Sequence, residues 1–366
     1  MQEQLTLYGW HLSYFTGKVL CYMRYKQIPF VDQPISLLML TWRIKRKTGA
    51  AVMPVLRTPG GDWIQDSSII MDRMEVLYPQ RPIEPSTPVQ RFASSLMEAW
   101  GDEWWIPMAM HTRWTYPENY ALFEKEAGES LLPHFPGFVQ RRAVAYVASI
   151  LRGYLPSVGV RPEQYALMDS WMARMLDLLD AHFMQQPYLF GGRPGVGDFG
   201  LVGSMYGHLG RDPWPARVLI APRPYLRAWI DRMAQPVETG GHDEWLAGDR
   251  IAPTLDAIFR IIFKEFLPML DGINRQVKAA LPGLPPGKTL PRGLDDVEMP
   301  MGEGRFRRMA MPYTLWMAQR TQDVYRAMDA QEQQQVRNWL DSVGGGHFLD
   351  LDMPRLRRSG LRVVAE

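Results

Sequence analysis

The sequence contains one cysteine, Cys21, among 366 residues. A single cysteine cannot form an intramolecular disulfide, and it leaves no cysteine cluster for a zinc site. An excess of charge of one sign is also missing, because 41 Lys and Arg residues balance 39 Asp and Glu residues. A near-neutral chain with its charges spread along the sequence argues against nucleic acid as a partner. One thiol and no disulfide fit a reducing compartment.

Long uncharged hydrophobic runs are missing as well. The most apolar late stretch, "IAPTLDAIFRIIFKEFLPML", is interrupted by Arg260, Lys264 and Glu265, so it is too charged to span a membrane. The first 20 residues lack a basic segment followed by an apolar run, so we expect no signal peptide. No P-loop, Ser-His-Asp order or HExxH motif is found. We expect a cytoplasmic protein with no membrane partner and no metal site.

The first 84 residues contain alternating signals for strands and helices. Residues 5–10 predict a strand, residues 18–27 a helix that ends before Pro29, and Phe30 starts a second strand. The basic segment "LTWRIKRKTGA" predicts a helix, and "VMPVLRTPGGDWIQDSS" predicts two strands joined by a Pro-Gly-Gly turn. A further helix, "SSIIMDRMEVLYP", has Ser67 available as its cap. The predicted order is βαβ followed by αββα.

After the Pro-rich linker "PQRPIEPSTP", the pattern stays helical to about residue 235. One long helix starts at Pro162 and has an apolar stripe with a period of 3.6 residues. The stripe consists of Leu167, Met168, Trp171, Met172, Met175, Leu178, Leu179 and His182. Its Met and Trp content indicates core packing rather than a cofactor site.

Residues 236–366 form a third section. A strongly amphipathic helix is predicted to start at Pro253 and to stop at Pro268, and its apolar face must pack on another part of the protein. Residues 281–304 are rich in Pro and Gly and predict a loop. Residues 312–345 predict two helices that end at a glycine cap.

Residues 7–18, "LYGWHLSYFTGK", place hydroxyl groups between the first strand and the first helix. The N–H groups at a helix start converge there and favour an anion, so Ser13 is placed to hold a thiolate, an oxyanion or a phosphate. A serine at this position also serves as an ordinary N-cap. This feature alone leaves both interpretations open.

Three segments in order, "LYGWHLSYFTGKVLCYMRYKQIPF", "VMPVL" and "WIQDSSII", resemble the N-terminal half of a glutathione S-transferase, a thioredoxin-like domain. The resemblance implies that Ser13 activates glutathione and that Pro54 is a cis-proline before the third strand. Backbone atoms of Met53 would pair with the cysteinyl part of glutathione. Asp66 and Ser67 would bind the γ-glutamyl end, the carboxylate receiving its ammonium group.

The segment "PYLFGGRPGVGDFGLVGSMYGHLGRDP", followed by "PYLRAWIDRM", resembles the C-terminal domain of the same family. Asp198 would be the buried structural aspartate at the start of a core helix, and Gly195 stands where the family usually has a Ser or Thr cap. The resemblance covers residues 5–235. It implies an α/β thioredoxin-like domain at 1–84, an all-α helical-bundle domain at 85–235, and a helical C-terminal extension at 236–366.

The implied activity is conjugation of glutathione, as co-substrate, to a small apolar electrophile, which is a detoxification reaction of proteins that commonly form homodimers. The thiol pKa must fall from about 8.5, and a hydroxyl on Ser13 with the dipole of a helix starting near Gly17 would lower it. Tyr14 and Tyr8 are rival hydroxyl donors. Cys21 is expected to be a small buried residue.

The segment "EAWGDEWWIPMAMHTRW" puts Trp104, Met108 and His111 on one helical face, which could form a wall for the electrophile or pack between domains. Arg113 lies on the same segment without an assigned role. A non-catalytic binding or scaffold protein is the main alternative, favoured by the long extension, whereas Asp66 and the serine after it favour glutathione. Glutathione-dependent reduction or isomerisation would use the same site.

Overall fold

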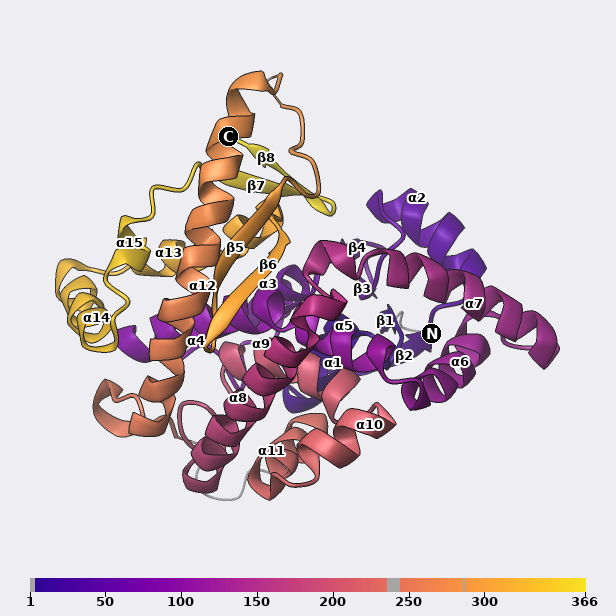
Figure 1. The fold of residues 1–366 in the computed structure, drawn as a ribbon, viewed down its shortest axis with the longest axis horizontal. Helices are drawn as coiled ribbons and strands as arrows, with labels where there is room; N and C mark the ends of the chain where they lie inside the picture. Colours follow the sequence, from indigo (N-terminus) through magenta and orange to yellow (C-terminus); the bar gives the residue numbers. More distant parts are fainter. Residues whose placement is uncertain (1–3, 236–243, 286) are drawn as a thin grey trace. The chain divides into compact units, whose positions relative to one another are not determined.

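The computed structural model describes residues 4–235, 244–285 and 287–366, and Figure 1 shows their secondary structure. They group into two compact units that interleave along the sequence. The first unit contains Met1–Ile83, Ala109–Leu155 and Leu201–Glu238. The second contains Glu84–Met108, Pro156–Gly200 and Thr239–Glu366. The C-terminal section therefore shares a unit with two earlier segments, and the three consecutive domains 1–84, 85–235 and 236–366 stay a prediction.

The first unit contains a four-stranded sheet in the order β2-β1-β3-β4. Strand β1 (Leu5–Gly9) runs parallel to β2 (Phe30–Pro34) and antiparallel to β3 (Val55–Arg57), which is antiparallel to β4 (Trp63–Gln65). The connecting helical elements are α1 (Tyr14–Tyr25), η1 (Met39–Ile44) and α2 (Lys45–Thr48), and α3 (Ser67–Leu77) follows β4. This confirms the predicted βαβ-αββα order and the thioredoxin-like fold of the N-terminal segment.

Helix α1 begins earlier than the sequence predicts, and α3 has a different N-cap. Helix α1 begins at Tyr14, not at Lys18 or near Gly17, because Ser13 is its N-cap. The cap of α3 is Asp66, and Ser67 is the first helical residue rather than the cap. Helix α1 therefore starts at the fifth residue after the end of β1, and α3 starts at the second residue after the end of β4.

The rest of the first unit is helical, as predicted. It contains α5 (Ile106–Thr115), whose first residues belong to the second unit, α6 (Glu118–Leu131), α7 (Gly137–Gly153), η4 (Met205–Leu209), α10 (Pro213–Pro215), η5 (Ala216–Ile220) and α11 (Pro224–Ala234). Helices α6 and α7 pack as a pair around a buried cluster that includes Phe123, Leu131 and Val144. Helix α1 contacts α3, α11 and the π-helical segment η4.

The second unit combines helices with two β-hairpins. Its main helices are α4 (Pro88–Trp104), α8 (Tyr165–Gln185), the start of α9 (Val196–Ser204), α12 (Pro253–Ala280), α13 (Pro312–Arg326), α14 (Ala330–Val343) and α15 (His347–Asp350). The short 3-10 segments are η2 (Pro156–Val158), η3 (Pro162–Gln164), η6 (Ala247–Asp249) and η7 (Leu281–Gly283). Strand β5 (Asp296–Met301) pairs with β6 (Gly304–Met309), and β7 (Leu356–Ser359) pairs with β8 (Arg362–Ala365).

Two expectations for the C-terminal section are wrong. Helix α12 does not stop at Pro268 but continues to Ala280, because its apolar face stays buried on both sides of the proline and offsets the lost backbone hydrogen bond. Residues 281–304 are not all loop, since strand β5 occupies Asp296–Met301. The expected pair of helices that end at a glycine is confirmed: α14 is closed by Gly344 in the left-handed conformation.

An aromatic cluster explains what the apolar face of the C-terminal section packs on. The ring of Trp104 in α4 lies 6.0 Å from that of Trp171 in α8 and 6.2 Å from that of Phe266 in α12. Phe306 in β6 lies 6.5 Å from Trp104. Because these rings are buried together, the C-terminal section and the preceding helices of the unit share one hydrophobic core.

The start of α9 is held by side chains of the second unit. Asp198 is fully buried, and its two oxygens accept hydrogen bonds from the N–H groups of Gly195 (2.9 Å) and Leu189 (3.1 Å). Ser94 of α4 accepts from the N–H of Gly197 at 3.1 Å. A Cβ on Gly195 would lie 2.8 Å from this serine oxygen. The predicted structural role of Asp198 is confirmed, and the hydroxyl that Gly195 lacks is supplied from another helix.

No single helix in the described part of the chain is long and apolar enough to cross a membrane. One pair of helices, at 137–158 and 162–185, passes the same test of length and composition only when taken together.

Candidate functional site

The sheet brings three of the predicted site segments to one edge. Tyr8 in β1 lies opposite Val55 in β3, and Val55 lies opposite Gln65 in β4, so these residues form one row across the strands. Adjacent strands are about 4.8 Å apart. Ser13 follows the end of β1, Pro54 directly precedes Val55, and the chain after Gln65 opens α3. The register therefore places the end of β1, the start of β3 and the end of β4 along the same edge, and the chain leads from this edge into α1 and α3.

Ser13 occupies the N-cap of α1. Its Oγ accepts a hydrogen bond from the N–H of Thr16 at 3.4 Å, and its carbonyl accepts from the N–H of Gly17 at 2.9 Å. Its own N–H donates to the carbonyl of Trp10 at 2.9 Å. The side chain is half-buried, and the first turn of α1 contains no acidic residue. The N–H groups and positive dipole end of α1 therefore favour an anion beside this hydroxyl.

The segment before β3 has the geometry that the resemblance implies. The Met53–Pro54 peptide bond is cis. The side chain of Gln65 holds this segment in place, because its Nε2 donates to the carbonyls of Ala50 (3.2 Å) and Val52 (2.9 Å). Met53 is half-buried, whereas the proline is buried. Gln65 was not assigned a role from sequence, although its place at the end of a strand in "WIQDSS" is a usable signal.

Asp66 has an unusual backbone for a residue with a side chain. Its φ is 95°, a region that costs such residues on the order of 1–3 kcal/mol and is often found at functional sites. Its Oδ1 accepts hydrogen bonds from the N–H groups of Ser68 (3.0 Å) and Ile69 (3.2 Å). Ser67 is buried beside it, 6% exposed. A half-exposed carboxylate thus lies at the start of α3, next to N–H groups that suit a second, negatively charged group.

The rival residues are all more buried than Ser13. Tyr8 stacks on Trp63 with ring centroids 5.4 Å apart, and Tyr14 is buried with its ring 6.0 Å from that of His208. Cys21 is fully buried, and burial raises the pKa of its thiol to about 12. A thiol with this pKa is protonated at neutral pH, so Cys21 is not a reactive thiolate.

The three residues expected to form a wall for the electrophile lie inside the protein. Trp104 is 1% exposed, and Met108 and His111 are 0% exposed. The tryptophan belongs to the aromatic cluster described above, while His111 pairs with Thr115 through Nδ1 and Oγ1 at 2.9 Å. These side chains have no accessible surface to offer a ligand, and we do not retain them as a substrate wall.

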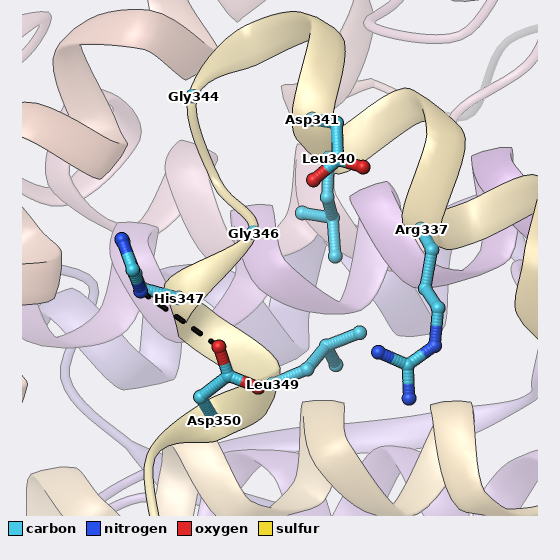
Figure 2. A pocket seen from close by; sticks show the side chains of 8 residues that line it. All are labelled: Arg337, Leu340, Asp341, Gly344, Gly346, His347, Leu349 and Asp350. Carbon is cyan, nitrogen blue, oxygen red and sulfur yellow. Dashed lines mark ion pairs between the residues drawn. The ribbon is translucent and has the colours of Figure 1, made fainter.

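One cavity in the described residues has a volume of about 430 Å³ and is lined by residues of the second unit. Figure 2 shows that it is lined by the end of α14 and by α15, with Arg337 on the former and His347 paired with Asp350 on the latter. None of the predicted site residues lines it. No group of three or more His, Cys, Asp or Glu residues in the described ranges could hold a metal ion.

Two solved structures illustrate what the chain is similar to. The β-etherase LigF from Sphingobium sp. strain SYK-6 is 18% identical over 63% of this chain and 95% of its own, with a TM-score of 0.41. A rice glutathione S-transferase, solved in complex with glutathione, is 16% identical over 63% of this chain and 88% of its own, with a TM-score of 0.40. At these TM-scores, neither likeness supports a conclusion about activity. No curated protein matches the chain.

Family models match the two segments in which the site and the core helix lie. Residues 7–82 match the model "Glutathione S-transferase, N-terminal domain". Residues 162–232 match the model "Glutathione S-transferase, C-terminal domain". The first match spans the whole sheet edge that carries Ser13, Pro54 and Asp66, and the second includes Asp198 and the start of α9. These two segments, residues 7–82 and 162–232, are therefore assigned to the N- and C-terminal domains of the glutathione S-transferase family.

Proposed function

We propose that the protein is a glutathione transferase in which Ser13 stabilises the thiolate of glutathione, and that a small apolar electrophile receives the sulfur. The observation that carries this proposal is the common sheet edge. Register pairing along Tyr8, Val55 and Gln65 aligns the start of α1 with the cis-proline segment and with the start of α3. An extended tripeptide can contact all three of these segments at once.

The residues at the edge fit the groups that glutathione carries. The carboxylate of Asp66 suits the ammonium of the γ-glutamyl end, and Ser67 with the N–H groups of α3 suits the carboxylate of the same end. The backbone of Met53 lies next to the cis bond, where it can pair with the cysteinyl part. The zwitterionic end and the extended backbone would thus be bound by different elements.

The hydroxyl of Ser13 is suited to a thiolate. Its oxygen already accepts the N–H of Thr16, so its own hydrogen can donate to the sulfur. This bond and the N-terminal dipole of α1 favour the charged form of the thiol. The thiol proton goes to solvent, the sulfur forms a bond to carbon of the electrophile, and the leaving group departs with the electron pair of the bond that breaks.

Two alternatives remain for experiment to separate. A binding or scaffold role is favoured by the burial of Trp104, Met108 and His111, because no wall for an electrophile is formed by the residues expected to make one. Glutathione-dependent reduction or isomerisation would use the same thiolate and is distinguished by its products. The proposal places a detoxifying enzyme in the cytoplasm and includes a homodimer as the assembly to test.

The thiolate of bound glutathione provides the test. Its ultraviolet absorbance is measured against pH for the wild type and for Ser13→Ala. In the wild type we expect a thiol pKa below the ordinary value of about 8.5, and in Ser13→Ala a rise of about one unit, because a hydrogen bond to a charged group is lost. Ser13→Thr should restore the wild-type value, since it keeps the hydroxyl.

Ser36→Ala is the matched control. Ser36 lies in the same unit, and its Oγ accepts from the N–H of Met39 at 3.3 Å, much as Ser13 accepts from Thr16. Its loss should leave the thiol pKa unchanged. A Ser13→Ala protein with the wild-type thiol pKa would remove Ser13 from the proposed chemistry.

A further inference from the structure

The guanidinium of Arg113, on α5, is buried among acceptors from three segments of the first unit. Its Nη1 donates to the carbonyl of Leu12 at 2.6 Å, and its Nη2 donates to the carbonyl of Gly207 at 2.5 Å. Its Nε and Nη2 also bind the two carboxylate oxygens of Asp212, at 2.9 and 3.0 Å. Arg113 is 5% exposed and Asp212 is 0% exposed. Such a bidentate pair fixes the plane of the guanidinium.

The contact with Leu12 acts on the peptide that leads into Ser13. The carbonyl of Leu12 and the N–H of Ser13 belong to one planar peptide group. That N–H donates to Trp10, and the carbonyl of Ser13 accepts from Gly17. The other polar atom of this peptide group is the carbonyl oxygen of Leu12, which Arg113 binds. Arg113 therefore holds the orientation of this peptide group, and with it the direction in which the side chain of Ser13 leaves the backbone.

The contact of Arg113 with Gly207 holds the segment that packs against Ser13 and Tyr14. Gly207 lies in the π-helical segment η4, and π-helical turns often occur at functional sites. A Cβ on Gly207 would lie 3.2 Å from the carbonyl oxygen of Ser13 and 3.3 Å from the Cα of Tyr14. The backbone of η4 thus packs directly on the cap of α1. Arg113 binds both of these backbone segments at once.

The carboxylate of Asp212 offsets the positive charge of Arg113, and the neighbouring His208 adds no charge. We therefore expect Arg113 to act on Ser13 through geometry rather than through its charge. Asp212 supplies one negative charge. Burial, and then the neighbouring Arg113, lower the pKa of His208 well below its ordinary value, so its ring is neutral at neutral pH. Its Nδ1 lies 3.2 Å from the carbonyl of Ala109, which can only accept, so Nδ1 carries the hydrogen. The unprotonated Nε2 then faces Nη1 of Arg113 at 3.4 Å.

We propose that Arg113 is a positioning residue that holds the hydroxyl of Ser13 in the orientation required to stabilise the thiolate. This inference rests on the function proposed above for Ser13, but the conformation of the loop can be measured without glutathione. Arg113 acts on Ser13 through the backbone that leads to the cap, at the carbonyl of Leu12.

The test uses Arg113→Lys, which keeps the charge but cannot bind two carbonyls and a carboxylate in one plane. We expect amide hydrogen exchange at Thr16 and Gly17 to become about tenfold faster, because a charge-assisted hydrogen bond at the cap is lost. We also expect the thiol pKa of bound glutathione to rise by about one unit, with the affinity for glutathione changed less than twofold. Adding Ser13→Ala should then give no further rise, because both changes act on one hydroxyl.

Arg308→Lys is the control for a buried arginine. Arg308 is 1% exposed, donates to the carbonyl of Glu103 at 2.8 Å, and lies in the second unit. Its replacement should leave exchange at Thr16 and Gly17 and the thiol pKa unchanged. If Arg113→Lys does not fold, the pair Arg113→Met with Asp212→Leu removes both charges together and should give the same two changes.

The outcomes separate the two proposals. Wild-type exchange at Thr16 and Gly17 in a folded Arg113 variant would overturn the positioning role, whether or not glutathione binds. Faster exchange with an unchanged thiol pKa would also overturn it. If the wild type binds no glutathione, the proposed function fails by itself, and the exchange measurement still decides whether Arg113 holds the loop.

Discussion

Replacing Asp198 with alanine is expected to destabilise the second unit by about 4 kcal/mol, because two buried backbone N–H groups lose their acceptor at a cost of about 1–3 kcal/mol each. These are the N–H groups of Gly195 and Leu189, and Asp198 itself is fully buried. The free energy of unfolding is measured by denaturant titration at neutral pH. A loss of this size is a large fraction of the stability of an ordinary domain.

Two further variants make the measurement specific. Asp198→Asn keeps one acceptor oxygen but turns an amide donor toward a buried N–H, so we expect a loss between those of the wild type and of the alanine variant. Asp231→Ala removes a half-exposed carboxylate that pairs with Arg227 on the surface, and it should change stability by less than about 0.5 kcal/mol. If Asp198→Ala lost no more than Asp231→Ala, Asp198 would not hold the start of α9.

Acid is expected to destabilise the second unit through His182. The ring is fully buried, its Nδ1 accepts from the hydroxyl of Thr254 (2.8 Å), and its Nε2 donates to the carbonyl of Tyr188 (3.3 Å). Burial lowers its pKa from 6.5 to about 4. In the unfolded chain, His182 therefore binds a proton below pH 6.5, whereas in the folded protein it stays neutral down to about pH 4. The contribution of His182 to the free energy of unfolding is fully present above pH 6.5, and it falls by about 3 kcal/mol as the pH drops from 6.5 to about 4.

The comparison with His182→Gln isolates this contribution. The variant has no titrating group at position 182, so its free energy of unfolding should fall less steeply between pH 7 and pH 4. His208, whose pKa burial also lowers, and Glu265, whose pKa burial raises, are the same in both proteins and cancel in the difference. His347→Gln, at a side chain that is 91% exposed, should follow the wild type. Parallel curves for wild type and His182→Gln would contradict the assignment.

The N-terminal fold was predictable because its signals are local. Alternation in the strands, the Pro-Gly-Gly turn and a hydroxyl before the first helix each depend on a few neighbouring residues. The candidate residues followed from the ordered segments around Ser13, Pro54 and Asp66. Their placement along one edge needed the register between β1, β3 and β4, which no local pattern contains.

The C-terminal section was less predictable because its structure depends on long-range packing. A proline such as Pro268 usually ends a helix, but here the apolar face of α12 is buried on both sides of it. Strand β5 contains Pro300 and belongs to a two-stranded hairpin, where each strand has one unpaired edge that tolerates a missing N–H. In the sequence alone, Pro268 therefore looks like the end of a helix and Pro300 looks like part of a loop.

The expected wall shows the limit of helical periodicity. A common face for Trp104, Met108 and His111 indicates that these side chains share an environment, but not whether that environment is a cleft or the core. Their burial shows that it is the core. Arg113, five residues beyond Met108 in α5, carried the more informative signal: it is the one Asp, Glu, Lys or Arg residue of this helix, and the structure buries it.

Binding of glutathione at the sheet edge is the central claim, and isothermal calorimetry of the wild type, Asp66→Asn and Asp62→Asn tests it most directly. Asparagine keeps the N-cap of α3 but removes the negative charge proposed to bind the ammonium, whereas Asp62 is exposed in the turn between β3 and β4. We expect the wild type and Asp62→Asn to bind alike and Asp66→Asn to bind about ten- to a hundredfold more weakly, from the loss of one charged hydrogen bond. Equal binding by all three proteins, or no binding by the wild type, would contradict this account.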